Sequence, residues 1–441
     1  MRTIWLAVAA AAFWAGGARA EPVLLISIDG LRPGDVIDAE ARGISAPTLR
    51  AILAEGAHAG GVVGVLPTVT YPNHTTLITG AAPARHGISN NTVFDPLRKN
   101  DGGWYWYATD IRTETLWDAV GESGGVASIG WPVSVGARAI DWNIPEYWRA
   151  WNLEDLKLVE ALSTEGLIAE LEKATGVPFS AFQDQSAGGD IARGKFAAAL
   201  IALKRPQLTT LHLISLDRFE HEEGPGSAKV VEMLEAIDGA IGELIAAARA
   251  AEPDLVVAIV SDHGFAPISQ TSNLMIPFIG AGLITYDAEK KAVTGWEAMP
   301  WGSGGSAAII LARPDDRKLK KRVAKFLAKL AGEGDLKISQ VIDAKEIARR
   351  GGAKEASFWV DFTPGQSAMG YKTEGALTAP ADGGTHGFFP GDPEMRASFF
   401  IVGPGVPAGR DLGEIDMRAI APTIAKRLGV TLDGAEEKPL F

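Results

Sequence analysis

Strand-length apolar segments followed by acidic residues are the most regular feature of the chain. Residues 22–28 form a continuous apolar run, and residues 209–216 and 254–261 are strand-like segments of similar length. Runs of this kind are typical of strands buried on both faces of a parallel sheet. An aspartate follows each segment, so the pattern predicts carboxylates at the carboxyl ends of central strands.

Longer segments with helical spacing alternate with these runs. The apolar spacing predicts helices over residues 46–56, 155–174, 188–204, 227–251 and 417–428. Further strands are expected over residues 60–66, 126–131 and 397–402. This alternation predicts an α/β fold built on a central, mostly parallel sheet.

The pattern changes between about residues 270 and 380. Glycine- and serine-rich turns at 302–306 precede a strand at 307–311 and a lysine-rich helix at 317–330. We expect a smaller α+β subdomain here, inserted into one catalytic domain that spans residues 21–441. It would border the site formed by the strand ends.

Composition and charge limit the class of protein. The chain has 441 residues, of which 46% are hydrophobic and 22% charged, so it can bury a large core. A net charge of −12 argues against a protein that coats nucleic acid. It does not exclude a small anionic substrate held by metal ions, because the ions dominate the local field.

The first twenty residues predict a signal peptide. Arg2 gives a basic start, residues 4–14 are apolar, and Ala18 and Ala20 supply the small residues of a cleavage site. The apolar run is short for a membrane span, and no later segment is long enough, although an uncleaved anchor is an alternative. The chain has no cysteine, which excludes disulfides and thiolate metal sites. We expect a periplasmic or secreted protein without a transmembrane span in the mature chain.

Acidic and imidazole side chains gather at the predicted strand ends and in one late loop. Open α/β sheets hold their ligands at the carboxyl ends of their strands. Carboxylates and imidazoles without thiolates suit catalytic zinc, and six such ligands suffice for two ions. The candidate ligands are Asp29, Asp217, His221, Asp262, His263 and His386.

Thr70 lies between the strand predicted at 60–66 and a short helical segment. A helix N-terminus presents unpaired N–H groups and attracts anions. A hydroxyl at this position could attack phosphorus if a metal ion lowered its pKa. The alternative is a threonine-rich turn in which Asn73 caps the helix.

Six short motifs occur together and in order along nearly the whole mature chain, at residues 28–33, 67–74, 86–91, 217–221, 261–264 and 384–387. Jointly they resemble the nucleotide pyrophosphatase/phosphodiesterase family of the alkaline phosphatase superfamily. The resemblance implies the three-layer α/β sandwich of alkaline phosphatase. It also implies two zinc ions per chain and a small phosphate ester as the partner.

The resemblance assigns a role to each candidate residue. It implies one zinc ion held by Asp217, His221 and His386. It implies a second held by Asp29, Asp262 and His263, with Thr70 as the nucleophile bridging to substrate. Asn91, with the Thr70 N–H, would bind a non-bridging phosphoryl oxygen.

The leading hypothesis is an exported two-zinc phosphodiesterase or nucleotide pyrophosphatase that acts through a phospho-threonine intermediate. A phosphomonoesterase or phosphonate hydrolase on the same scaffold is the alternative, and a non-catalytic binding protein would be expected to have lost a ligand. A sulfatase is excluded, because its modified nucleophile is missing. In the segment 134–138, Gly136 stands where the resemblance places a lysine in threonine-dependent monoesterases, while Arg138 is kept. This favours a diester.

Several other residues receive predictions. Glu220 replaces a glycine that the family usually has before the metal histidine, and we expect it to face solvent. Tyr71 is expected to contact an ester group of the substrate. His74 and His86 are expected to be structural, with His74 near the nucleophile loop and off the metals. His58 and His212 are interpreted as incidental, and Trp104 and Trp106 as lid packing.

Overall fold

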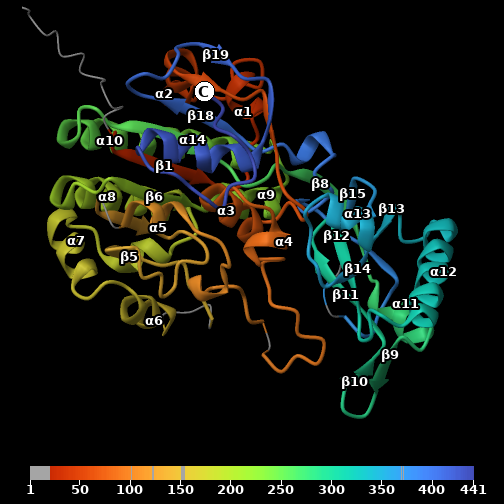
Figure 1. Cartoon of the computed structure of the whole chain (residues 1–441). Helices are drawn as coiled ribbons and strands as arrows, with labels where there is room; N and C mark the ends of the chain where they lie inside the picture. Colours follow the sequence, from red (N-terminus) through yellow and green to blue (C-terminus); the bar gives the residue numbers. More distant parts are fainter. Residues whose placement is uncertain (1–19, 101, 122–123, 150–153, 369, 371) are drawn as a thin grey trace, which may run out of the picture.

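The central sheet of the computed structural model begins with β1 (Val23–Ile28). In the described residues (20–100, 102–121, 124–149, 154–368, 370 and 372–441), its strand order is β19-β2-β18-β7-β1-β6-β4-β5 (Figure 1). The other strands of this sheet are β2 (Ala57–His58), β4 (Val126–Ile129), β5 (Trp142–Ile144), β6 (Leu208–Leu213), β7 (Val256–Val260), β18 (Phe399–Val402) and β19 (Arg410–Asp411). The signal peptide predicted at residues 1–20 lies outside the described residues, except for Ala20.

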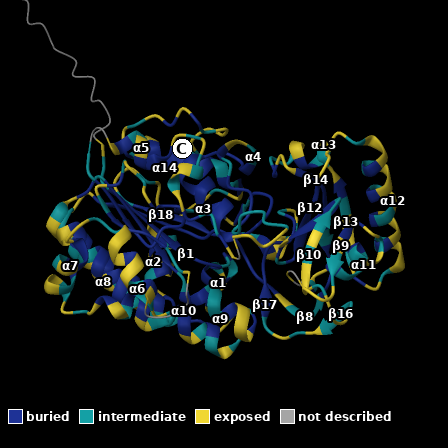
Figure 2. Ribbon diagram, turned by 90° about the horizontal axis from the view of Figure 1, so that it is seen from below, coloured by how far each residue is buried: buried dark blue, intermediate teal, exposed yellow. Residues whose placement is uncertain are grey.

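β1 pairs in parallel with both β6 and β7, so the three predicted apolar strands lie side by side at the centre of the sheet. Successive side chains of a strand point to opposite faces. Leu24 and Ile26 accordingly belong to one apolar core, and Val23 and Leu25 to another. Both faces of the sheet are therefore covered, and Figure 2 shows its strands as buried.

Helices on the two faces complete a three-layer sandwich. Those packed on the Leu24 face include α2 (Pro47–Glu55), α6 (Glu154–Leu162), α7 (Leu167–Thr175), α8 (Ala187–Lys204) and α10 (Ala228–Ala251). Those on the Val23 face include α3 (Thr70–Thr79), α5 (Leu116–Gly121) and α14 (Ile420–Arg427). The predicted α/β fold with a central, mostly parallel sheet is confirmed.

A second group of sheets lies beside the central one and has a core of its own (Figure 1). An antiparallel sheet has the order β11-β12-β14-β13, formed by Ala298–Ser303, Ser306–Leu311, Ala356–Phe362 and Ile338–Asp343, with α12 (Arg317–Glu333) packed on it. Nearby elements are β8 (Ala266–Ser272), α11 (Met275–Gly280), β9 (Ile284–Asp287), β10 (Ala292–Trp296), α13 (Ala344–Arg349), β15 (Gly365–Ala368), β16 (Thr378–Pro380) and β17 (Gly384–Thr385). Apart from β17 and the first residues of β8, these elements lie in the region of about residues 270–380 where we predict an inserted subdomain, whose boundaries stay a prediction.

Two predicted elements differ in detail. The strand predicted at 60–66 is β3 (Gly61–Val63), which pairs with β20 (Glu414–Asp416) outside the central sheet. The helix predicted at 155–174 is two helices, because Gly166 takes a left-handed φ of 75° immediately before α7. The other short helices are α1 (Gly34–Ile37), α4 (Pro83–His86) and α9 (Ser215–Glu223).

Among the described residues, the helices are too short or too polar to cross a bilayer.

Candidate active site

Thr70 is the first residue of α3, and its side chain lies at the mouth of a buried corner. Val69, just before it, is extended, so the chain turns sharply into the helix. Asn73 holds this turn together: its Nδ2 donates to the carbonyls of Pro67 and Val69 at 2.9 and 2.8 Å, and its Oδ1 accepts from the Val65 N–H at 2.9 Å. Asn73 therefore fixes the approach to the helix from within its first turn, and the alternative in which it caps the helix is not supported, because Val69 is the N-cap residue.

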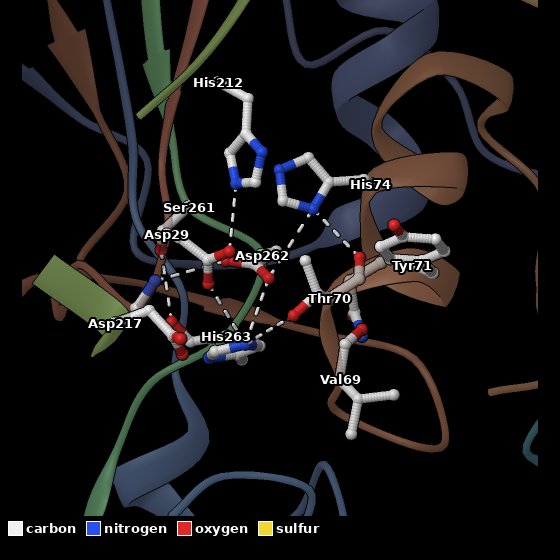
Figure 3. Close-up of polar contacts among 12 residues, drawn as sticks. Asp29, Val69, Thr70, Tyr71, His74, His212, Asp217, Ser261, Asp262 and His263 are labelled. Carbon is white, nitrogen blue, oxygen red and sulfur yellow. Dashed lines mark hydrogen bonds and ion pairs between the residues drawn. The ribbon is translucent and has the colours of Figure 1, made fainter. Parts of the chain in front are cut away.

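Asp29 and Asp262 follow the neighbouring strands β1 and β7 (Figure 3). His263 Nε2 lies 3.0 Å from Asp262 Oδ2 and 3.4 Å from Asp29 Oδ1. The Thr70 hydroxyl lies 3.5 Å from the same nitrogen. The sheet thus delivers two carboxylates and one imidazole to the corner that holds Thr70.

Asp217 and His221 come from α9, because β6 already ends at Leu213. We predicted Asp217 at a strand end, and the structure corrects this. The two residues are one helical turn apart, with His221 Nε2 3.5 Å from Asp217 Oδ1. His386, just after β17, brings its Nε2 to 3.7 Å from the same oxygen. Its ring stacks on that of His263 at 3.6 Å between centroids.

Backbone carbonyls orient the three imidazoles. Because a carbonyl only accepts, Nδ1 must be the protonated nitrogen in each ring. His221 donates to the Gly384 carbonyl at 3.0 Å, His263 to that of Gly264 at 3.2 Å, and His386 to that of Thr68 at 3.1 Å. Each Nε2 is therefore directed to the centre of the cluster, as in histidines that bind metal.

Unpaired carboxylate oxygens show that the cluster fits cations. Asp29 Oδ1, Asp217 Oδ1 and Asp262 Oδ2 are buried without a hydrogen-bond partner. Buried charge is costly unless it is compensated, and bound metal ions would compensate it. Two overlapping groups have ligand atoms within 4.8 Å of one another: Asp29, Asp262 and His263, and Asp217, His263 and His386. His263 belongs to both groups, so the predicted division of ligands between two ions stays a prediction.

Burial and the neighbouring charges also shift the pKa values of Asp29 and His263. Burial, then the charges of Asp262 and Asp217, raise the pKa of Asp29 well above its ordinary value. Although burial opposes it, the carboxylate of Asp262 raises the pKa of His263 to about 9. A metal ion at His263 would take the place of this proton, because an imidazole binds metal only when the coordinating nitrogen is deprotonated.

A cavity of about 290 Å³ opens on Thr70, and Asn91 lines it. Asn91 Oδ1 accepts from the Tyr71 N–H at 2.8 Å. This bond fixes the amide and leaves its NH₂ group as the donor. A second cavity of about 520 Å³ adjoins the first, and the two share the side chains of Glu146, Trp148, Gln185, Ile214 and Arg218.

Tyr71 is fully buried at the wall of the first cavity. Its ring packs edge-on against Trp104 and Trp148, at 5.2 and 6.4 Å between centroids. Trp104 also lines the cavity, whereas Trp106 packs on Tyr147 away from it. Burial, and then the charge of Glu146, raise the pKa of Tyr71, so the phenol remains neutral.

His212 is buried within the site, and the prediction that it is incidental is wrong. Its Nε2 lies 2.9 Å from Asp29 Oδ2 and its Nδ1 2.9 Å from Glu146 Oε2. The pairing of the strands explains its position. β6 is parallel to β1, and His212 is in register with Ser27, two residues before Asp29.

Glu220 is buried, and the prediction that it faces solvent is also wrong. It lies one turn after Asp217 on α9, so it shares the inward side of the helix. Its Oε1 is 3.6 Å from Arg32 Nε, and Arg32 also binds Asp35 at 2.9 Å. Burial raises the pKa of Glu220 well above its ordinary value.

Arg138 is exposed, and neither it nor Gly136 lines the cavity at Thr70. Arg138, which segment 134–138 keeps and which the sequence left open as a possible contact of the phosphate, is therefore not placed at this site. Arg218 of α9 is the arginine that lines this cavity. A sequence comparison of segment 134–138 could not reveal this, because α9 contributes the residue from another part of the chain.

His74 and His86 have the structural roles predicted. His74 Nδ1 donates to the Thr70 carbonyl at 2.9 Å, and His86 contacts Thr76 Oγ1 at 3.2 Å. Burial lowers the pKa of each imidazole to about 3. His58 is half-buried on β2, away from this cluster.

Comparison with known proteins bears on the family. The sequence profile of type I phosphodiesterase/nucleotide pyrophosphatase matches residues 23–389. Venom phosphodiesterase of Macrovipera lebetinus is 25% identical over 285 residues, which are 60% of this chain and 29% of that protein. Ectonucleotide pyrophosphatase/phosphodiesterase family member 3 of Rattus norvegicus is 25% identical over 263 residues, covering 57% of this chain and 25% of that one. The match therefore spans less than a third of these relatives.

Solved structures agree on the fold. Human ectonucleotide pyrophosphatase/phosphodiesterase 5 superposes with a TM-score of 0.63 at 19% identity, over 93% of this chain and 96% of that one. An inactive variant of the murine protein in complex with AMP gives the same values. The fold, the extent of the profile match and the motifs agree: this chain belongs to the type I phosphodiesterase/nucleotide pyrophosphatase family of hydrolases.

Proposed function

We propose that the protein is an exported phosphodiesterase or nucleotide pyrophosphatase that uses two zinc ions and Thr70 as its nucleophile. The observation that carries this proposal is the position of Thr70, at a helix N-terminus in a site where three carboxylates each have a buried oxygen without a hydrogen-bond partner. The ions would be held by Asp29, Asp217, His221, Asp262, His263 and His386. When bound, two such ions lower the pKa of a nearby hydroxyl and stabilise charge on phosphoryl oxygens.

In the proposed reaction, Thr70 Oγ1 forms a bond to phosphorus while the bond to the leaving oxygen breaks. The hydroxyl proton passes to solvent, and the alcohol or phosphate leaves and takes up a proton from solvent according to its own pKa. Water then cleaves the phospho-threonine and restores the hydroxyl. The Asn91 amide, fixed by the Tyr71 N–H, and the N–H of Thr70 would donate to a non-bridging oxygen throughout.

Two observations support a diester over a monoester. The adjoining cavity of about 520 Å³ gives room for a second ester group beside the nucleophile. Arg218, at the shared wall, is engaged by Glu222 at 3.0 Å and by the Gln185 carbonyl at 3.2 Å. A monoester dianion needs extra positive charge at its terminal oxygens, and this guanidinium is already compensated. The relatives named above support a nucleotide-type ester.

The test compares two chromogenic substrates on the zinc-loaded protein. We expect a nitrophenyl nucleotide diester to be cleaved with a kcat/KM at least about tenfold above that of nitrophenyl phosphate, or about 1.4 kcal/mol. Thr70→Ala serves as the background control. Equal values, or a preference for the monoester, would favour the phosphomonoesterase or phosphonate hydrolase.

Export is proposed from the N-terminal sequence. The small residues Ala18 and Ala20 follow the apolar run at residues 4–14, and β1 begins shortly after them at Val23. Protein recovered from the periplasm of a Gram-negative host is expected to begin at Glu21. A cytoplasmic protein that keeps Met1 would contradict export.

A further inference from the structure

His212 lies between two carboxylates in the interior, and Figure 3 shows its contact with one of them, Asp29. Its two ring nitrogens are each 2.9 Å from an oxygen, Asp29 Oδ2 on one side and Glu146 Oε2 on the other. Only 1% of its surface is exposed. Its Nδ1 is also 3.2 Å from the Gly130 carbonyl. Polar neighbours at both ends therefore fix the rotation of the ring.

Because of these contacts, the two carboxylate oxygens of Asp29 have different roles. Oδ2 is held by His212, whereas Oδ1 has no hydrogen-bond partner and faces His263 at 3.4 Å. A carboxylate that could rotate would present either oxygen to a metal ion. The His212 contact removes that freedom and leaves Oδ1 as the ligand atom.

Glu146 anchors the other end of the arrangement. It follows β5, at the far edge of the central sheet from β7, and is 6% exposed. Its side chain also forms part of the wall between the two cavities. Removing its charge would leave the imidazole with one carboxylate partner. Substitution of a group that orients a metal ligand in this way commonly lowers metal affinity by about 10- to 100-fold.

We propose that His212 and Glu146 are positioning residues that hold Asp29 in the orientation in which it binds one of the two metal ions. This inference rests on the proposed two-zinc function. Its effect is local, since His212 contacts Asp29 and none of Asp217, His221 or His386 in the contacts of the described residues. One ion of the two is therefore affected.

The test compares glutamine and asparagine at position 212, because their side-chain amides differ in length. Glutamine places its NH₂ group near the position of imidazole Nε2, whereas asparagine places it near Nδ1. We expect His212→Gln to keep the contact with Asp29 while it loses the contact with Glu146, and to weaken the binding of one ion less than His212→Asn does. We expect His212→Asn to lose about tenfold or more in affinity for one ion and to keep the other unchanged.

Affinity is measured by titrating the metal-free protein with Zn²⁺ against a chromogenic chelator, and the coordination geometry by Co²⁺ spectra. His86→Asn is the matched control, because it removes another fully buried histidine away from the cluster; it is expected to bind both ions normally. Glu146→Gln keeps the shape of the anchor and is expected to weaken the same single ion as His212→Asn. It carries the test if His212→Asn does not fold.

Three outcomes overturn the inference. The two His212 variants could weaken binding equally, both ions could be weakened together, or both variants could bind as wild type does. The first two indicate general loss of packing. Failure of the proposed function is distinguishable, because wild-type protein would then bind no zinc, which would overturn both claims.

Discussion

At the scale of single residues, one polar atom of a side chain is held by a hydrogen bond within the protein, and this orients its other polar atom toward the site. Asn91 gives its carbonyl oxygen to the Tyr71 N–H at 2.8 Å, so only its NH₂ group is available to a substrate. The imidazoles of His221, His263 and His386 likewise donate from Nδ1 to backbone carbonyls, so their Nε2 atoms point inward. Orientation at this scale comes from the fold, before any ligand arrives.

Asn91→Asp separates the two roles of the amide. The aspartate can still accept from the Tyr71 N–H, but it loses the donor and adds a negative charge facing the phosphate. We expect kcat/KM on a nucleotide diester to fall about 100-fold or more, with zinc content unchanged. Steady-state kinetics and metal analysis check this. Unaltered kinetics would remove Asn91 from the phosphate site.

Asp361 predicts a pH dependence of stability. It lies on β14, accepts from the Phe389 N–H at 3.0 Å, and burial raises its pKa to about 7. The unfolded carboxyl titrates near 4, so between about pH 4 and 7 the folded state binds more protons, and stability falls as pH rises. Asp361→Asn removes this loss.

We expect Asp361→Asn and wild type to unfold with similar free energies at pH 4, where the carboxyl is protonated in the folded state and about half protonated in the unfolded state. At pH 8 the variant is expected to be more stable by about 2–4 kcal/mol. Denaturant unfolding at the two pH values measures the difference. A gap of the same size at both would show that the charge of Asp361 is not the cause.

At the scale of elements, α9 is positioned by a side chain of α8. Asp190 accepts from the N–H groups of Ile214 and Ser215 at 3.1 and 3.0 Å, and it pairs with Arg193 at 2.9 Å. A carboxylate at a helix N-terminus satisfies unpaired donors and the helix dipole. Since α9 carries Asp217 and His221, Asp190 links α8 to the metal cluster.

Asp190→Ala is expected to destabilise the fold by about 2–4 kcal/mol, because it leaves buried donors and Arg193 unpaired. It is also expected to weaken zinc binding at the ion held by Asp217. Thermal unfolding and zinc titration measure the two effects. If the variant is destabilised but binds zinc with full affinity, Asp190 stabilises α9 without affecting the metal site.

The elements that apolar patterning predicts well are those buried on both faces. β1, β6 and β7 are such strands, and their order in the sheet explains why acids far apart in sequence meet. Patterning did not place His212 or Glu220, because each is buried by a partner from another element, Asp29 and Arg32 respectively. The short strands β8–β10 were also missed, since they alternate irregularly and lack long apolar runs.

At the scale of the molecule, the candidate ligands join distant parts of the chain. They extend from Asp29, after the first strand, to His386, next to the second group of sheets. A metal that binds only the folded state stabilises it by RT ln(1 + [L]/Kd), about 4 kcal/mol at 1,000 times Kd. Metal binding should therefore hold the two groups of sheets together.

We expect metal analysis to find close to two zinc ions per chain, and a chelator to lower Tm by several degrees and abolish activity. Restoring Zn²⁺ should recover both. One ion per chain with full activity would contradict the two-metal proposal. An unchanged Tm after complete removal of metal would contradict its part in stability.

The central claim is that Thr70 is the nucleophile, and a trapped adduct tests it most directly. Zinc-loaded protein is mixed with a nucleotide diester, quenched in acid within the first turnover, and digested for mass spectrometry. The account predicts a nucleotidyl group on Thr70, absent from Thr70→Ala, which keeps its zinc. Thr68 is the internal control, because its hydroxyl is buried and donates to the Phe388 carbonyl at 2.7 Å. A reproducible adduct on Thr68, or rapid turnover by Thr70→Ala, would contradict the account.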